Sequence, residues 1–321
     1  MPTNAVLDLA LADGLNPAPL AAAGWQVVCL EVPVLTELGT VVCDVVLFNP
    51  DIGHLLVVEA KSGANIEPDQ ARKLAAIDPQ VLINAGGVTV PQAVRPRCEV
   101  LFACLARHST RITQGLAAAG LSTPVLAVDA NAAYLVDPAM ASADLGGALG
   151  EASAWIHPIA RIIPFDHESP AHVFDGPVQA ELVAAMARGR PSVTMRALTE
   201  QVVSHFALYG KRAQGQLVRK ITEATRRAVS KEPERLRFQA ATGTTEARVV
   251  ILRSPEQFDR RGRTQGYQAV FSGRGRRRPR PQVPGQMDLF IELDQAERVT
   301  TDETGQNDSD GSDDVRGGER P

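Results

Sequence analysis

Apolar residues gather into three neighbouring stretches in the first part of the chain, and each stretch is typical of a β-strand. The first stretch runs over Trp25–Val34 and is rich in β-forming residues. The second runs over Val41–Phe48, and the third runs over Leu55–Val58 and continues into Lys61. Asn49–Gly53, between the second and the third, has the composition of a turn. The pattern therefore predicts one strand followed by a β-hairpin.

Further strands and helices are predicted on both sides of this hairpin. A helix between two buried strands implies a crossover connection and parallel pairing of those strands. We therefore expect residues 1–165 to form an α/β domain with a mixed central sheet flanked by helices. Its other predicted elements are a helix over Asn4–Leu15, a helix that begins at Pro68, a strand over Glu99–Ala106, a helix over Thr110–Ala119 and a strand over Pro124–Asp129.

Charged residues interrupt both strands of the hairpin. Asp44 lies in the middle of the second stretch, while Glu59 and Lys61 share one face of the third because side chains alternate along a strand. Two close carboxylates repel each other, and their burial costs free energy unless a cation neutralises them. An ion that prefers oxygen ligands, Mg²⁺ or alternatively Mn²⁺, suits such a site. The Lys61 ammonium would hold a water or offset charge that develops on a phosphate.

The order Asp44, then Glu59-Ala60-Lys61 one strand later, resembles the core motif of the PD-(D/E)XK nuclease superfamily. The resemblance implies a restriction-endonuclease-like fold. It makes Asp44 and Glu59 metal ligands, the Ala60 carbonyl a third ligand, and Lys61 the group that positions the attacking water. Cys43 stands where this family usually has a proline, a position that carries no chemistry. An exposed hairpin with ordinary surface charges is the alternative interpretation.

The same resemblance raises two further points about the site. Some family members use a glutamine in the next helix to orient the lysine or to bind DNA, and Gln70 has that place here. Leu74 stands near the position where the helicase-linked branch has a tyrosine, which argues against that branch. A first helix often supplies an extra acid in the family, so Asp8 is a candidate, and Glu31 and Glu37 are rivals nearer the hairpin. The sequence leaves this choice open.

The second half of the chain predicts a linker with a connecting helix over residues 166–190 and a smaller α+β domain over 191–256. Its helices are expected over Gln179–Arg188, Arg196–Leu208 and Gln214–Ser230, followed by a hairpin whose turn is Thr242–Thr245. Helices followed by a hairpin resemble a winged helix, which commonly binds DNA. The last helix would turn four cations toward solvent and DNA: Arg219, Lys220, Arg226 and Arg227. A protein-binding helical domain is the alternative.

Residues 257–321 are expected to form a disordered tail, first basic and then acidic. Its basic part would bind phosphate backbones without regard to sequence. That part carries eight arginines and no acid over Arg260–Arg280, including Arg276, Arg277 and Arg278. A short apolar motif at 286–290 follows, with Gln286, Met287, Leu289 and Phe290.

This motif is similar to the bacterial sliding-clamp-binding motif, with Met287 in place of Leu. In that resemblance Gln286 hydrogen-bonds at the mouth of the clamp pocket, while Leu289 and Phe290 fill it. An edge strand that folds back on the chain is the alternative, because five residues are easily matched by chance.

Composition adds few constraints. The net charge is −4, and the four cysteines lack Cys-x-x-Cys spacing, which favours reduced core residues over zinc ligands or disulfides. The start of the chain lacks the features of a signal peptide, and no stretch is long enough to cross a bilayer. These features predict a cytoplasmic protein without a membrane partner.

Together with these resemblances, the patterns imply a Mg²⁺-dependent deoxyribonuclease that reaches DNA through its C-terminal half and the sliding clamp, in repair or replication. Two rivals stay open at this point. One is a DNA-binding adaptor that keeps the nuclease fold without catalysis, and the other is a restriction or phage-defence effector nuclease.

Overall fold

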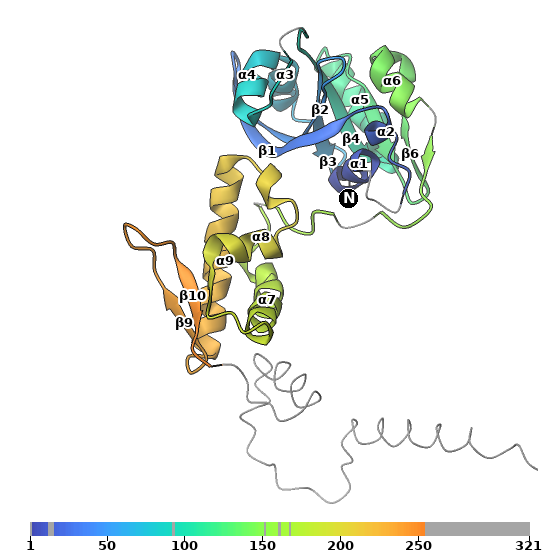
Figure 1. The fold of residues 1–321 in the computed structure, drawn as a ribbon. Helices are drawn as coiled ribbons and strands as arrows, with labels where there is room; N and C mark the ends of the chain where they lie inside the picture. Colours follow the sequence, from blue (N-terminus) through green and yellow to red (C-terminus); the bar gives the residue numbers. More distant parts are fainter. Residues whose placement is uncertain are drawn as a thin grey trace, which may run out of the picture. The chain divides into compact units, whose positions relative to one another are not determined.

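A seven-stranded mixed sheet forms the centre of the first part of the chain in the computed structural model (Figure 1). The structure describes residues 2–11, 16–91, 94–150, 152–159, 162–166 and 168–253. The arginine-rich segment and the motif at 286–290 lie outside these residues. The strands lie in chain order across the sheet: β1 (Gln26–Thr36), β2 (Gly39–Asn49), β3 (His54–Lys61), β4 (Arg97–Leu105), β5 (Val125–Val128), β6 (Ala132–Leu135) and β7 (Ser153–Ala154).

The pairing directions confirm the predicted mixed sheet. β1, β2 and β3 are antiparallel neighbours, so the predicted strand and hairpin are present. β3, β4 and β5 run parallel, because helices connect them. β6 and β7 then add to the edge in antiparallel fashion. The sequence patterns did not predict β6, β7 or the two helices α4 and α6, all of which have eight residues or fewer.

Two apolar clusters cover the faces of this sheet. On one side, Leu56 and Val58 of β3 belong to the cluster that contains α1 (Pro2–Ala10) and α2 (Pro19–Ala22). The alternate residues Leu55 and Val57 belong to a second cluster. This second cluster contains residues of α3 (Pro68–Ala75), α4 (Pro79–Gly86) and α5 (Ser109–Ala118), while α6 (Ala143–Leu149) joins the first. The apolar runs of β3 and β4 are thus buried on both faces, as parallel strands usually are.

Local signals explain where α3 and α4 begin and end. Pro68 occupies the first turn of α3, where its missing N–H costs nothing. The Asp78 carboxylate caps α4 by accepting hydrogen bonds from the backbone N–H groups of Gln80 and Val81. Gly87 ends α4 in the left-handed conformation, with φ of 63°.

A smaller module follows the large sheet. It contains, in order, η3 (Ala171–Phe174), α7 (Asp175–Ala187), β8 (Ser192–Thr194), α8 (Met195–Val202), η4 (Phe206–Leu208), α9 (Lys211–Lys231), β9 (Leu236–Gln239) and β10 (Arg248–Ile251). β8, β10 and β9 form a three-stranded antiparallel sheet in that order. The predicted hairpin is confirmed, and its turn is closed by backbone hydrogen bonds between Thr242 and Thr245.

One predicted helix of this module is shorter than expected. The helix predicted to end at Leu208 ends at Val202, and His205 follows in the left-handed conformation with φ of 56°. The 3₁₀ turn η4 then redirects the chain into α9. The apolar periodicity of the sequence extends to Phe206 because the Phe206 side chain is buried. Phe206 nevertheless lies beyond the end of the helix.

The module shares its core with the large sheet. Phe174, Leu182 and Leu217 belong to the same apolar cluster as Leu30 of β1 and Leu9 of α1. The described residues of both parts also belong to one compact unit. Among the described residues, no helix combines the length and apolar character that a membrane crossing requires.

Candidate active site

The predicted site lies where β2 and β3 separate. Their ladder ends at the pair Val45 and Val58, so Ala60 has no strand-paired residue on β2 to accept its backbone N–H. Asp44 supplies that partner, because its Oδ2 accepts a hydrogen bond from the Ala60 N–H at 2.7 Å. The carboxylate of Asp44 is thereby fixed beside the strand that carries Glu59 and Lys61.

Glu59 is the buried acid of this site, with 3% of its surface exposed. It pairs with Phe102 of β4 and lies on the face covered by α3 and α5. Its Oε1 lies 2.8 Å from the Lys61 Nζ. Its Oε2 is buried and has no hydrogen-bond partner among the described residues. Such an orphaned oxygen costs free energy unless something outside the chain contacts it.

Gln70 of α3 joins the two charges of the Glu-x-Lys motif. Its amide N–H donates to the Glu59 Oε1 at 2.8 Å, and its carbonyl accepts from the Lys61 Nζ at 2.7 Å. The helix periodicity set by Pro68 turns Gln70 toward the sheet while Ala71 and Leu74 pack into the core. The structure therefore brings together all four predicted catalytic residues: Asp44, Glu59, Lys61 and Gln70.

The electrostatics of the site oppose a charged Glu59. The pKa of Glu59 is raised from 4.5 to about 7, mainly by burial and also by the charge of Asp44, against the lowering effects of Lys61 and Gln70. The raising causes outweigh the lowering ones because a buried carboxylate loses its water. Ionised Glu59 therefore favours binding of a cation.

The predicted oxygen ligands fit a small divalent ion in chemistry. Asp44 and Glu59 offer two carboxylates, Glu59 keeps an unpartnered buried oxygen, and Ala60 contributes a backbone carbonyl. Within the described ranges, no three or more His, Cys, Asp or Glu side chains are grouped to hold a metal. A cation here would therefore complete its coordination with water, as Mg²⁺ commonly does.

The three candidates for an extra acid occupy different places. Asp8 is fully buried on α1, on the face opposite Glu59, and its Oδ2 accepts a hydrogen bond from the Asn16 amide at 2.6 Å. Glu37 is exposed in the turn between β1 and β2. Glu31 lies on β1, opposite Asp44 by the register of the strands. None of the three forms part of a larger acidic cluster with Asp44 and Glu59 in the described chain.

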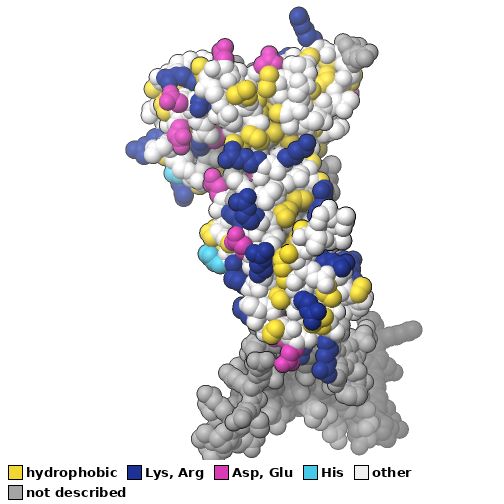
Figure 2. Space-filling view, turned by 90° about the vertical axis from the view of Figure 1, so that its left-hand side faces the viewer, with side chains coloured by type: hydrophobic (Ala, Val, Ile, Leu, Met, Phe, Trp, Pro, Cys, Tyr) yellow, Lys and Arg dark blue, Asp and Glu magenta, His cyan; other side chains and the backbone are white. Residues whose placement is uncertain are grey.

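The four cations predicted for DNA contact on α9 differ in exposure. Arg219 and Arg226 are exposed, and Arg226 also stacks over the Phe238 ring at 5.0 Å. Lys220 and Arg227 are half-buried. Figure 2 shows Lys and Arg side chains recurring down one face of the molecule, with Asp and Glu side chains between them.

Lys220 and Arg227 form hydrogen bonds inside the chain. The Arg227 guanidinium bonds both oxygens of Asp175 and the Ala171 carbonyl. The Lys220 ammonium donates to the Ser169 carbonyl. Lys220 and Arg227 therefore tie α9 to residues 169–175, while 41% of the Arg227 side-chain surface stays exposed to solvent.

A second buried polar group, which the sequence patterns missed, lies at the other end of β3. His54 is 2% exposed, stacks beside Trp25 at 5.0 Å, and places its Nε2 3.3 Å from a Glu99 oxygen. Its Nδ1 lies 3.6 Å from an oxygen of Asp144, which also pairs with Arg97. The pKa of His54 is lowered from 6.5 to about 4, mainly by burial and also by the charge of Arg97, against the raising effect of Glu99.

His54→Gln is expected to reduce the acid sensitivity of the fold. Because the folded-state pKa lies below the unfolded value of 6.5, neutral His54 stabilises the fold above pH 6.5. That stabilisation is lost as the pH falls from 6.5 to about 4, by about 1–3 kcal/mol. Urea unfolding across this window should show a smaller loss for His54→Gln than for wild type. The exposed-site variant His172→Gln is the control, and equal slopes for all three proteins would contradict the assignment.

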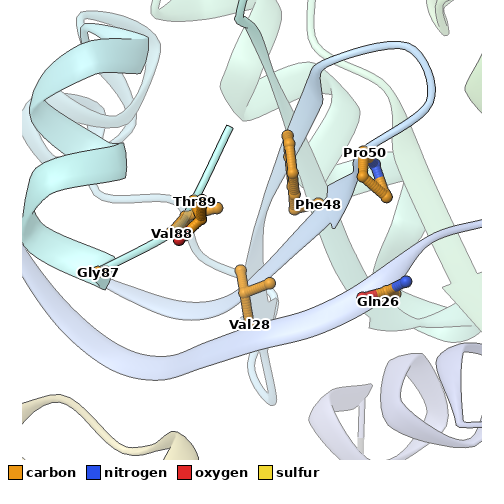
Figure 3. Close-up of a pocket in the computed structure, with 8 residues that line it drawn as sticks. Gln26, Val28, Phe48, Pro50, Gly87, Val88 and Thr89 are labelled. Carbon is orange, nitrogen blue, oxygen red and sulfur yellow. The ribbon is translucent and has the colours of Figure 1, made fainter. Parts of the chain in front are cut away.

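A pocket of about 280 Å³ lies between β1, β2 and the segment after α4 (Figure 3). Val28 and Phe48 line it from neighbouring strands, and Val88 and Thr89 line it from the segment after α4. Phe48 is four positions beyond Asp44 on β2, toward the β2–β3 turn. None of the four predicted catalytic residues lines this pocket.

The model of the MJECL32 domain family matches residues 2–101, which is under a third of the 321 residues. The matched range contains α1, the hairpin and α3, and therefore Asp44, Glu59, Lys61 and Gln70. No curated protein and no solved structure matches the chain significantly.

Proposed function

We propose that this protein is a metal-dependent DNA nuclease of the PD-(D/E)XK type that hydrolyses phosphodiester bonds in the cytoplasm. The observation that carries the proposal is the joined network of Asp44, Glu59, Lys61 and Gln70 at the point where two strands separate. The network links the acid, the Glu-x-Lys pair and the helix glutamine in the arrangement that the family motif implies.

Asp44, Glu59 and the Ala60 carbonyl would hold Mg²⁺, or alternatively Mn²⁺. Such an ion activates water and offsets the charge that develops on the phosphate. Lys61 would hold the attacking water close to the phosphorus and contribute its own positive charge. Gln70 keeps the Lys61 ammonium beside Glu59, because its amide bonds both groups. The chain thus fixes the position of each charged group before substrate binds.

The module from α7 to β10 supports nucleic acid as the substrate. Its order of helix, strand, two helices and a β-hairpin resembles a winged helix. Arg219 and Arg226 on α9 are exposed and would contact phosphates. Lys220 and Arg227 would instead hold the module together. The arginines of the tail, including Arg276, Arg277 and Arg278, would add contacts that weaken as salt rises.

The motif from Gln286 to Phe290 would recruit the enzyme to the bacterial sliding clamp. Its apolar side chains Met287, Leu289 and Phe290 suit a clamp pocket, and Gln286 suits a polar contact at its mouth. A clamp partner places the activity in repair or replication.

A cleavage panel tests this function. Wild-type protein with Mg²⁺ or Mn²⁺ is incubated with labelled single-stranded, duplex, nicked and branched DNA, and with EDTA as the control. We expect cation-dependent cleavage of at least one DNA form and none with EDTA. DNA that is bound but stays intact in every reaction would contradict the nuclease and favour the adaptor.

A further inference from the structure

The edge of the large sheet is partly covered by the segment that enters α9. β1 is the outermost strand, and Tyr209 forms a parallel bridge with Leu30. The Gly210 N–H donates to the Leu30 carbonyl at 2.8 Å. Tyr209 is 3% exposed, and its hydroxyl donates to the Phe165 carbonyl at 3.0 Å. The Tyr209–Gly210 segment is therefore held at both its side chain and its backbone.

The contact lies at Leu30, one residue before the strand pair that contains Asp44. Leu30 pairs with Val45 and Val32 pairs with Cys43, so Glu31 stands opposite Asp44. Glu31 has φ of 49°, a left-handed conformation that costs free energy for a residue with a side chain. Strain of this kind persists only where the surroundings enforce it.

Both strands change their alternation at this residue pair. Leu30 and Val45 belong to the cluster under α1, whereas Val32 and Cys43, each two positions away, belong to the cluster under α3. In a regular strand, residues two apart would face the same side. At Glu31 and Asp44 both strands are therefore kinked. At this kink the Asp44 side chain hydrogen-bonds the Ala60 N–H.

Position 210 has no room for a side chain. A Cβ on Gly210 would lie 2.8 Å from the Glu31 carbonyl oxygen and 3.2 Å from the Val32 Cα. Both are backbone atoms of β1 at the strained Glu31 and the residue after it, so the backbone of the strand would have to move. The glycine therefore permits a close approach that packing of any larger residue would prevent.

We propose that Tyr209 and Gly210 are positioning residues, which hold the kink in β1 and thereby keep Asp44 on the Ala60 amide in the geometry that cleavage needs. The inference rests on the proposed function of the Asp44 site. Because α9 begins at Lys211, the same segment joins the DNA-contacting helix to the site. Cleavage then requires the module to be docked on β1, whereas DNA binding without cleavage does not require this docking.

The test compares Gly210→Ala with Gly215→Ala in the full chain. Gly215 lies within α9, and a Cβ there meets no atom within 4 Å, so it is a matched control. The first readout is amide hydrogen exchange at Ala60, followed by NMR, with the Val57 amide in the middle of β3 as the internal reference. We expect Gly210→Ala to raise the Ala60 exchange rate roughly tenfold or more over Val57, and Gly215→Ala to leave it unchanged.

The second readout is the division between kcat and KM. Gly210→Ala should lower kcat on the order of 10- to 100-fold at an unchanged KM for DNA, because a small displacement of Asp44 disrupts positioning but not binding. Tyr209→Phe removes the tie to Phe165 without adding an atom, and should shift both readouts in the same direction by less. If Gly210→Ala does not fold, Tyr209→Phe provides the test of the proposal.

Wild-type exchange at Ala60 in both Gly210→Ala and Tyr209→Phe would overturn the proposal. Faster exchange at Ala60 and Val57 alike would also overturn it, because that pattern means general destabilisation. The exchange measurement needs no cleavage. If wild-type protein cleaves no DNA, the nuclease proposal fails while the link between Gly210 and the Ala60 amide is still decided.

Discussion

Asp44→Asn is expected to lower Mg²⁺-dependent DNA cleavage by about 10²–10³-fold, because loss of one charged ligand removes several kcal/mol of charge stabilisation. The substitution keeps the size of the side chain, and its amide oxygen can still accept the hydrogen bond from the Ala60 N–H. The fold should therefore persist. DNA affinity, measured by fluorescence anisotropy in EDTA, should stay within about twofold because the module and tail carry most phosphate contacts.

The control for this prediction is Asp51→Asn, which removes one exposed carboxylate in the turn between β2 and β3. Its cleavage rate should equal that of wild type. Equal loss in both variants would point to net charge instead of the site. Full cleavage activity of Asp44→Asn would show that catalysis does not need the Asp44 carboxylate.

Glu59→Gln is expected to stabilise the cation-free fold at neutral and alkaline pH. The folded-state pKa of Glu59 is raised from 4.5 to about 7, so the fold prefers the neutral side chain. By linkage, this stability is present in wild type below pH 4.5 and is lost as the pH rises through 7. The variant keeps a neutral side chain throughout, so above pH 7 it should exceed wild type by about 1–3 kcal/mol.

Urea unfolding in EDTA between pH 5 and pH 8 measures this difference. The exposed-site variant Glu67→Gln should follow wild type across the range. Mg²⁺ should raise the Tm of wild type but not of Glu59→Gln, because a bound ion would stabilise only the ionised pair. A variant less stable than wild type at pH 8 would contradict the burial argument.

The hairpin and its charges could be predicted because their signals are local. Apolar runs separated by a turn specify β2 and β3, and alternation places Glu59 with Val57 on the inner face. Pro68 fixes the start of α3, so the helical period brings Gln70 toward the strands. These residues lie within 30 positions of one another, and short-range patterns suffice to relate them.

Other features depend on contacts between distant residues. The bond from Arg227 to Asp175 joins positions 52 apart, so a local pattern of cations could not reveal it. The burial of Asp8 depends on Asn16. The side-chain carbonyl of Asn16 in turn accepts hydrogen bonds from the backbone N–H groups of Ile156 and His157. The left-handed Glu31 depends on a segment nearly 180 residues later, which no periodicity in β1 encodes.

The candidate site combines several features that lower stability. Glu59 has a buried unpartnered oxygen and a neighbouring carboxylate, and Glu31 on the adjoining strand has a strained backbone. A chain selected only for stability would replace Glu59 with an apolar residue. Costs of this kind are typical of catalytic sites, which gain preorganised charges in return.

The most direct test of the nuclease site is the rate of Mg²⁺-dependent DNA cleavage by wild type, Lys61→Met and Lys73→Met purified side by side. Lys73 lies on α3 near the β1–β2 turn and does not bond Glu59, so its variant controls for the loss of one positive charge. Wild type and Lys73→Met should cleave at similar rates, while Lys61→Met binds DNA and leaves it intact. Equal cleavage by all three proteins would contradict the site, as would no cleavage by any of them.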